Sequence, residues 1–144
     1  MKIEIREMLP EDLPQVAMLE QEIFTQPGSE KSYAVSLASE DTGYVTAWAD
    51  GIFAGYSGYL RSFEEADITN VAVSEEFRGK GIGYKMLLCL MEAGRKKGIE
   101  RYTLEVRIGN AAAIHLYEKL GFERVGVRPG FYEKPKEDAL IMWT

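Results

Sequence analysis

The chain has 144 residues, of which 46% are hydrophobic and 28% are charged, as in an ordinary globular domain. Its single cysteine, Cys89, excludes an internal disulfide and a cysteine-cluster zinc site. The net charge of −6 argues against a general nucleic-acid-binding protein, which would present a basic face. We expect one domain over residues 1–144, because a chain of this length can bury a sufficient core.

Residues 2–6 alternate apolar and charged side chains, which contradicts the hydrophobic segment of a signal peptide. No apolar run approaches the roughly 20 residues needed to span a bilayer. The sequence therefore predicts a cytoplasmic protein with no membrane partner.

The first half of the chain predicts a strand, two helices and three further strands. Ser29 is in position to cap the second helix, and Asp50-Gly51 is a turn dipeptide typical of hairpins. The expected elements are strand 2–6, helix 10–24, helix 29–38, and strands 43–49, 52–60 and 66–73.

The second half alternates helices and strands, and glycines mark where the helices end. Gly98 and Gly121 follow two helical patterns, and Asn110 is in position to cap the second of them. The expected elements are helix 82–97, strand 101–108, helix 110–120, and strands 122–128 and 138–143. The order predicts an α/β (α+β) fold with a mixed central sheet of about seven strands flanked by about four helices.

A glycine-rich turn, Arg78-Gly79-Lys80-Gly81-Ile82-Gly83, joins a strand to a helix. Glycines let backbone N–H groups approach a phosphate, and a helix N-terminus adds partial positive charge. The pattern is neither a Walker loop nor a dinucleotide fingerprint, because Tyr84 takes the place of the third glycine. The turn predicts an anion site, with a turn of purely structural purpose as the alternative.

The charge is divided unevenly along the chain. Residues 1–76 carry 4 Lys or Arg against 15 Asp or Glu, and residues 77–144 carry 13 against 8. The division indicates one region that favours an anion and one that favours a cation, and ordinary surface variation is the alternative.

The motif Arg78-x-x-Gly81-x-Gly83 resembles the acetyl-CoA-binding motif of the GNAT superfamily of acetyltransferases. Over residues 66–144 the chain is similar to the RimI-like ribosomal-protein-alanine N-acetyltransferases of that superfamily. The segments that carry this similarity are Leu104-Glu105-Val106-Arg107, Asn110-Ala111-Ala112-Ala113-Ile114-x-Leu116-Tyr117, Leu120-Gly121-Phe122 and Tyr132-x-x-Pro135-x-Glu137-Asp138-Ala139-x-x-Met142. One departure is Pro27-Gly28-Ser29, where these enzymes usually have tryptophan in the middle.

The resemblance implies a GNAT-like fold and acetyl-CoA as co-substrate, with no metal. The residues that it places against acetyl-CoA are Val71, Ala72, Val73, Arg78, Gly79, Lys80, Gly81, Ile82, Gly83, Tyr84 and Asn110. Candidates for lining the acceptor groove are Tyr33, Phe131, Tyr132 and Glu133.

Glu105 and Tyr117 are the candidate catalytic residues. From the residues alone, Glu105 is either a surface partner of Arg107 or an interior carboxylate with a task. Tyr117 falls on one helical stripe with Ile114 and Leu120, which favours a core anchor. The resemblance implies instead that Glu105 is the general base and that Tyr117 is the general acid for the departing CoA thiolate.

Two other reactive residue types receive no catalytic role. His115, the only histidine, points away from Tyr117 and is expected on a solvated face, and Cys89 is expected to be a buried small hydrophobe. By analogy with the fold, a backbone N–H near Val73, freed by an irregularity in its strand, would stabilise the tetrahedral oxyanion.

The resemblance implies direct acetyl transfer to the N-terminal alanine amine of a small-subunit ribosomal protein, whose usual sequence begins Ala-Arg-Tyr. No direct nucleic-acid binding is expected, and the sequence does not fix the oligomeric state. The alternatives are a GNAT enzyme of small amines, an acetyltransferase of broader protein N-termini, and a non-catalytic acetyl-CoA sensor.

Overall fold

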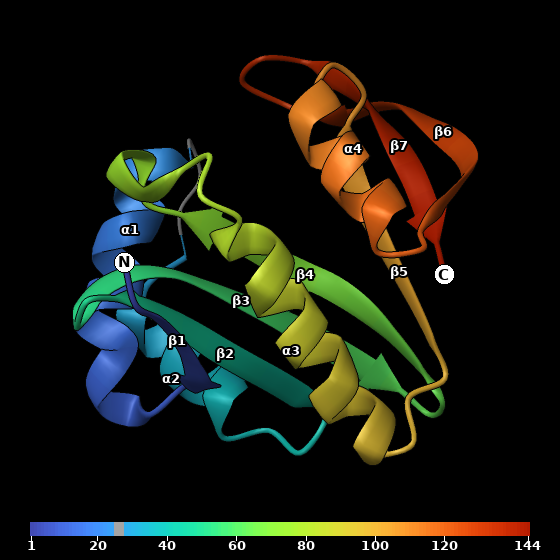
Figure 1. The fold of residues 1–144 in the computed structure, drawn as a ribbon. Coiled ribbons are helices and arrows are strands. Elements are labelled where there is room, and N and C mark those ends of the chain that lie inside the picture. The colour runs from blue at the N-terminus through green and yellow to red at the C-terminus, as the bar shows by residue number, and fades with distance from the viewer. Residues whose placement is uncertain (25–27) are drawn as a thin grey trace.

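The computed structural model describes residues 1–24 and 28–144, and these form one sheet covered by helices (Figure 1). The strand order is β1-β2-β3-β4-β5-β7-β6. The strands are β1 Ile3–Glu7, β2 Thr42–Ala49, β3 Ile52–Ser62, β4 Glu65–Val73, β5 Arg101–Arg107, β6 Glu123–Tyr132 and β7 Glu137–Trp143. The helices are α1 Leu13–Ile23, α2 Glu30–Leu37, α3 Ile82–Lys96 and α4 Ala111–Lys119, with short 3-10 turns at Pro10–Asp12 and Glu75–Phe77. The expected fold class is confirmed for the described residues.

β4 and β5 are the parallel pair of an otherwise antiparallel sheet in the described part of the chain, and they pair only briefly. Residues 65–67 of β4 face residues 101–103 of β5. Beyond them the two strands separate, as their diverging ribbons show in Figure 1. On its other side β4 carries a bulge, because Gly58 of β3 faces Asn70 whereas the next residue, Tyr59, faces Ile68. The sheet therefore opens between β4 and β5, next to the extra residue, Thr69.

Two hydrophobic clusters hold the helices on the sheet. The larger lies under α3, which crosses the face of the sheet nearer the viewer in Figure 1. Its helical contribution includes Met86, Leu87 and Leu90, each at most 1% exposed, and each such side chain contributes about 1.5–3 kcal/mol by burial. The second cluster includes Val16 of α1, Tyr33 of α2, and residues of β2 and β3.

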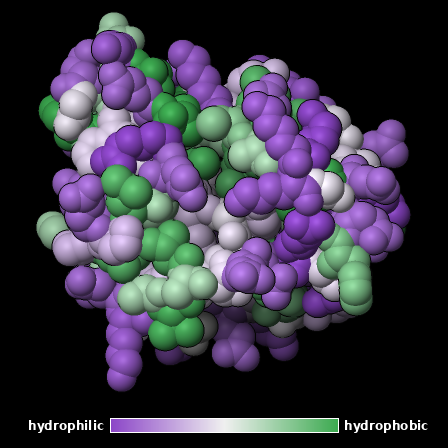
Figure 2. All heavy atoms as spheres, turned by 90° about the horizontal axis from the view of Figure 1, so that it is seen from below, coloured by the Kyte–Doolittle hydropathy of each residue, from purple (hydrophilic) through white to green (hydrophobic). Residues whose placement is uncertain are grey.

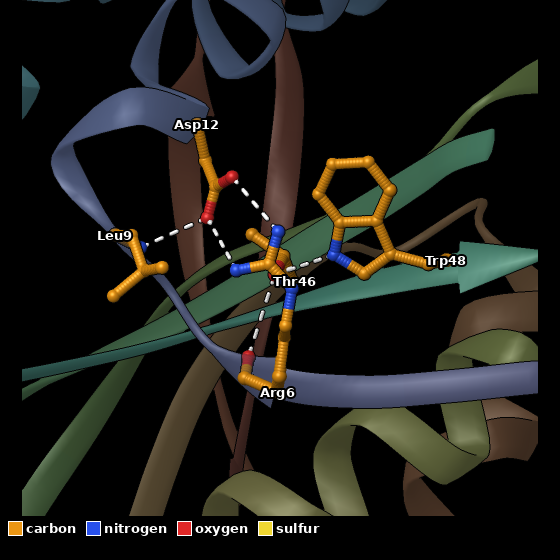
Figure 3. A network of polar contacts seen from close by, with 5 residues as sticks. All are labelled: Arg6, Leu9, Asp12, Thr46 and Trp48. Carbon is orange, nitrogen blue, oxygen red and sulfur yellow. Dashed lines mark hydrogen bonds and ion pairs between the residues drawn. The ribbon is translucent and has the colours of Figure 1, made fainter. Parts of the chain in front are cut away.

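A polar network fixes the start of α1 against the sheet (Figure 3). Both terminal guanidinium nitrogens of Arg6 donate to the buried carboxylate of Asp12, at 3.2 and 3.1 Å, and the Leu9 N–H donates to the same carboxylate at 2.9 Å. The Arg6 guanidinium also stacks over the Trp48 ring, whose N–H donates to Thr46 at 3.0 Å. Because a buried charge left unpaired is costly, this network fixes where α1 begins.

Local signals placed most elements correctly and some boundaries wrongly. The hairpin of β2 and β3 turns at Asp50 and Gly51, both with positive φ, as the dipeptide predicts. The expected helix 10–24 is a 3-10 turn followed by α1, and the strand expected to end at residue 128 continues as β6 to Tyr132.

The described helices include none that is long and apolar enough to cross a membrane. The face turned downward in Figure 1 carries small hydrophobic patches divided by hydrophilic side chains (Figure 2).

Candidate active site

The separation of β4 and β5 produces a cleft of about 600 Å³. Its walls are Phe24, Ile68, Thr69, Asn70, Val71, Leu104, Glu105, Val106, Arg107, Asn110, Tyr117, Phe131, Tyr132 and Glu133. A second cleft of about 1070 Å³ lies between the end of β4, the glycine-rich turn, α3 and α4. Both clefts include Phe24, Val71 and Asn110, so the two clefts adjoin along these residues.

The second cleft has the properties of an anion site. Gly79 and Gly81 have φ values of +74° and +78°, and a Cβ at either position would meet open space, so the backbone N–H groups of the turn are accessible. Gly81 is the N-cap of α3, whose positive end faces the same turn. Arg78 and Lys85 line this cleft, and the Arg78 Nε–H donates to the Val73 carbonyl at 3.1 Å. The site therefore suits a polyanion with a long tail along β4.

Ten of the eleven residues predicted to contact acetyl-CoA line this second cleft. Lys80 is the exception, because its exposed side chain is not part of the wall. His115 is exposed, as expected, and also lines this cleft. Cys89 was expected to be buried and is instead half-buried, with a thiol pKa raised by burial and by the nearby Glu92 carboxylate.

Glu105 projects from β5 into the first cleft, and its side chain is 24% exposed. Burial raises the pKa of its carboxyl, the charge of Asp67 raises it further, and Arg128, with Nη1 at 3.8 Å from Oε1, opposes the rise. Arg107 does not neutralise Glu105, because it pairs with Glu137 at 3.2 Å. The interpretation of Glu105 as a surface partner of Arg107 is therefore wrong. Glu105 faces the cleft as a carboxylate of raised basicity.

Tyr117 lines the same cleft from α4 and is only 7% exposed. Its ring packs edge-on against Phe122 with centroids 5.9 Å apart, so the tyrosine is also a core anchor. Burial raises the pKa of Tyr117 to about 12, with a smaller contribution from Tyr132, and the phenol is protonated at neutral pH. The Asn110 side chain caps α4 by accepting from the Ala113 N–H at 3.2 Å.

Of the four acceptor-groove candidates, Phe131, Tyr132 and Glu133 line the first cleft. Arg107 holds this segment in place, because its guanidinium donates to the Glu133 carbonyl at 3.3 Å and stacks on the Tyr132 ring at 4.5 Å. Tyr33 does not line the cleft, because its ring is buried against Tyr56 with centroids 5.8 Å apart. In the segment 27–29, where the sequence departs from the pattern of the similar enzymes, residue 27 lies outside the residues that the structure describes.

The wall of the first cleft includes seven residues that the sequence did not indicate as site residues: Phe24, Ile68, Thr69, Asn70, Leu104, Val106 and Arg107. The structure also moves the strand irregularity: Val73 faces Gly55 in regular register, and the bulge lies at Thr69. Beyond Asp67 the edge of β4 that faces β5 has lost its partner strand. Backbone donors on that edge are therefore open to the cleft, where they can stabilise an oxyanion.

The comparisons with known proteins agree with this geometry. The model of the Acetyltransferase (GNAT) family matches residues 13–122. The [ribosomal protein bS18]-alanine N-acetyltransferase of Escherichia coli (strain K12) is 34% identical over 133 residues, which cover 91% of this chain and 89% of that protein.

Two solved structures are also similar. The crystal structure of the ribosomal-protein-S18-alanine N-acetyltransferase from Escherichia coli has a TM-score of 0.89 and 33% identity, and covers 99% of this chain and 92% of that one. The acetyltransferase yncA from Salmonella typhimurium, solved with acetyl-CoA, shares the fold with a TM-score of 0.88 at 19% identity, over 100% of this chain and 94% of that one. The chain belongs to the GNAT family of acetyltransferases.

Proposed function

We propose that the protein transfers an acetyl group from acetyl-CoA to the N-terminal alanine amine of a small-subunit ribosomal protein. The observation that carries the proposal is that the two clefts adjoin, with Glu105 and Tyr117 in the wall of the first cleft, which would hold the acceptor. The similarity to the Escherichia coli alanine N-acetyltransferase supports this choice of acceptor.

Acetyl-CoA would enter through the larger cleft. The N–H groups of the glycine-rich turn and the positive end of α3 would bind the pyrophosphate, and Arg78 and Lys85 would add charge. The pantetheine would follow β4 at Val71 to Val73, which brings the thioester to the boundary of the two clefts.

Glu105 would act as the general base. An α-amine has a pKa of about 7.7–8.0 and must lose a proton before it can attack. The Glu105 carboxylate, whose pKa is raised by burial, accepts that proton directly or through one water. The amine nitrogen then forms a bond to the thioester carbon, without an acyl-enzyme, and gives a tetrahedral oxyanion.

Collapse of this intermediate breaks the carbon–sulfur bond. Open N–H groups on the edge of β4 stabilise the oxyanion before collapse. The Tyr117 hydroxyl, which is protonated at neutral pH, donates its proton to the departing thiolate. The nitrogen releases its remaining extra proton to solvent, solvent returns a proton to the tyrosinate, and the products are the N-acetylated chain and CoA. Because burial disfavours both the tyrosinate and the thiolate, proton transfer is expected to accompany cleavage of the bond.

The test is mass spectrometry of a peptide beginning Ala-Arg-Tyr after incubation with acetyl-CoA. We expect acetylation at the α-amine, and Glu105→Gln to reduce the rate about 10²- to 10⁴-fold. Glu123→Gln is the matched control, because Glu123 lies exposed on β6 outside the walls of both clefts.

The other acceptors predict different results in the same experiment. Acetylation of a polyamine as fast as the peptide would replace the proposal with a small-amine enzyme. Equal rates for many first residues would indicate a broader N-terminal acetyltransferase. Binding of acetyl-CoA without any turnover would indicate a sensor.

A further inference from the structure

Glu20 of α1 is a buried carboxylate that the proposed reaction does not use. It is 4% exposed, and within residues 1–24 and 28–144 no Lys, Arg or His lies within ion-pair distance of it. The hydroxyl of Tyr56 donates a hydrogen bond to it, and burial raises its pKa. An apolar side chain would fill this place at lower cost, so the carboxylate needs an explanation other than packing.

The Tyr56 hydroxyl connects Glu20 to two further side chains. It lies 2.9 Å from the Tyr33 hydroxyl and 3.4 Å from Asn70 Nδ2, which also donates to the Tyr33 hydroxyl at 3.2 Å. Because a carboxylate can only accept, Tyr56 must donate to Glu20, and its oxygen must then accept from Tyr33 and Asn70. The donation from Tyr56 to Glu20 thus gives the whole chain of hydrogen bonds one direction.

Asn70 is the end of this chain of hydrogen bonds that reaches the first cleft, which is the acceptor cleft of the proposed function. It lines the cleft beside the bulge at Thr69, and its backbone carbonyl accepts from the buried Ser57 hydroxyl at 2.7 Å. Its side-chain N–H groups are directed inward to the two tyrosines. The Oδ1 atom accepts from the Thr69 hydroxyl at 2.7 Å, and its second lone pair is left for another donor.

We propose that Glu20 and Tyr56 are positioning residues that hold the Asn70 side chain with its carbonyl oxygen available to the acceptor cleft. There the oxygen accepts a hydrogen bond from an N–H group in the first residues of the acceptor. The inference rests on the proposed function, since it assigns a contact to the peptide that the cleft would hold.

A double-mutant cycle on the Ala-Arg-Tyr peptide tests the inference. Glu20→Gln keeps the side-chain shape but offers a donor as well as an acceptor, so Tyr56 is no longer obliged to donate to it and the direction of the hydrogen bonds is no longer fixed. Tyr56→Phe removes the hydroxyl at the centre of the network. We expect each to raise the KM for the peptide about tenfold, as the loss of one hydrogen bond does, with the dissociation constant of acetyl-CoA unchanged. Asn70→Ala should give the same rise, and Glu20→Gln added to it should give no further rise.

Tyr102→Phe is the matched control. It also removes a buried tyrosine hydroxyl, which donates to the Met91 carbonyl at 2.8 Å away from the walls of both clefts. We expect the control to leave the KM for the peptide unchanged. Independent losses from Glu20→Gln and Asn70→Ala, or an equal weakening of acetyl-CoA binding, would overturn the positioning role.

A second measurement needs no acceptor and separates this inference from the proposed function. In ¹⁵N–¹H spectra the side-chain amide of Asn70, identified by its loss in Asn70→Asp, should shift in Glu20→Gln and Tyr56→Phe. It should not shift in Tyr102→Phe. An unmoved signal would contradict the inference even if the peptide is acetylated, whereas a shifted signal with no acetylation would contradict only the proposed acceptor.

Discussion

The pKa of Glu105 is raised mainly by burial of its carboxyl, and two neighbours of opposite charge adjust it: Asp67 raises it further and Arg128 lowers it. A general base works in its deprotonated form, so the rate should rise with pH through this pKa. Arg128→Gln removes the stabilising charge, and we expect the acid limb of kcat/KM to move to higher pH. Asp67→Asn removes the repelling charge, and the limb should move to lower pH. Shifts in the same direction for both variants, measured as pH–rate profiles, would contradict the assignment of this limb to Glu105.

Tyr117 has a pKa of about 12, so its proton is present throughout the range in which the enzyme is assayed. We expect Tyr117→Phe to lower kcat about 10²-fold with little change in acetyl-CoA affinity, because the ring that packs on Phe122 is kept. Single-turnover kinetics measure this step. Tyr102→Phe, which removes another buried hydroxyl with a pKa of about 12, should retain kcat. An unchanged kcat in Tyr117→Phe would leave the thiolate to be protonated by solvent.

The positions of residues in the cleft were predictable where a motif carried them and not where they depend on distant contacts. Glu105 and Tyr117 were found through the family pattern, and both line the cleft. Tyr33 was placed in the acceptor groove because helical spacing does not say which face of α2 is buried. Asn70 was missed, because its partner Tyr33 is 37 positions away in the sequence.

At the scale of elements, α4 would link cofactor binding to catalysis through its N-cap residue, Asn110. Asn110 caps this helix and lines both clefts, and Ser29 caps α2 by accepting from the Ser32 N–H at 3.1 Å. We expect Asn110→Ala and Ser29→Ala each to cost about 1 kcal/mol of unfolding free energy, measured by urea titration. Only Asn110→Ala should also weaken acetyl-CoA binding by calorimetry. Equal effects of the two variants on acetyl-CoA affinity would show that Asn110 acts on the fold alone.

Elements were predicted well where turn chemistry is local. Gly98 and Gly121 follow α3 and α4 with positive φ, and each lies where the sequence predicted the helix to stop. The bulge at Thr69 could not be placed, because a register shift is a property of two strands rather than of one. The opening of the sheet depends on the same long-range pairing.

At the scale of the whole molecule, the uneven charge of the sequence corresponds only partly to the two clefts. Arg78, Lys85 and Lys119 of the basic half line the larger cleft, as expected for a polyanion. The acceptor cleft takes its carboxylates, Glu105 and Glu133, from the same basic half. The carboxylates of the acidic half therefore cannot select a cationic acceptor by contact in this cleft, and their effect there would be a long-range field.

This difference between contact and field predicts how the two substrates respond to salt. Increasing the ionic strength from 0.01 M to 1 M shortens the screening length from about 30 Å to about 3 Å. We expect acetyl-CoA binding to weaken steeply, because its charges meet several exposed cations. A preference for Ala-Arg over Ala-Glu peptides, measured as a ratio of kcat/KM, should fall toward one over the same range if the acidic half acts at long range. A ratio that persists at 1 M would instead place the selection in direct contacts in the cleft, above all with Glu105, which is partly buried and less screened.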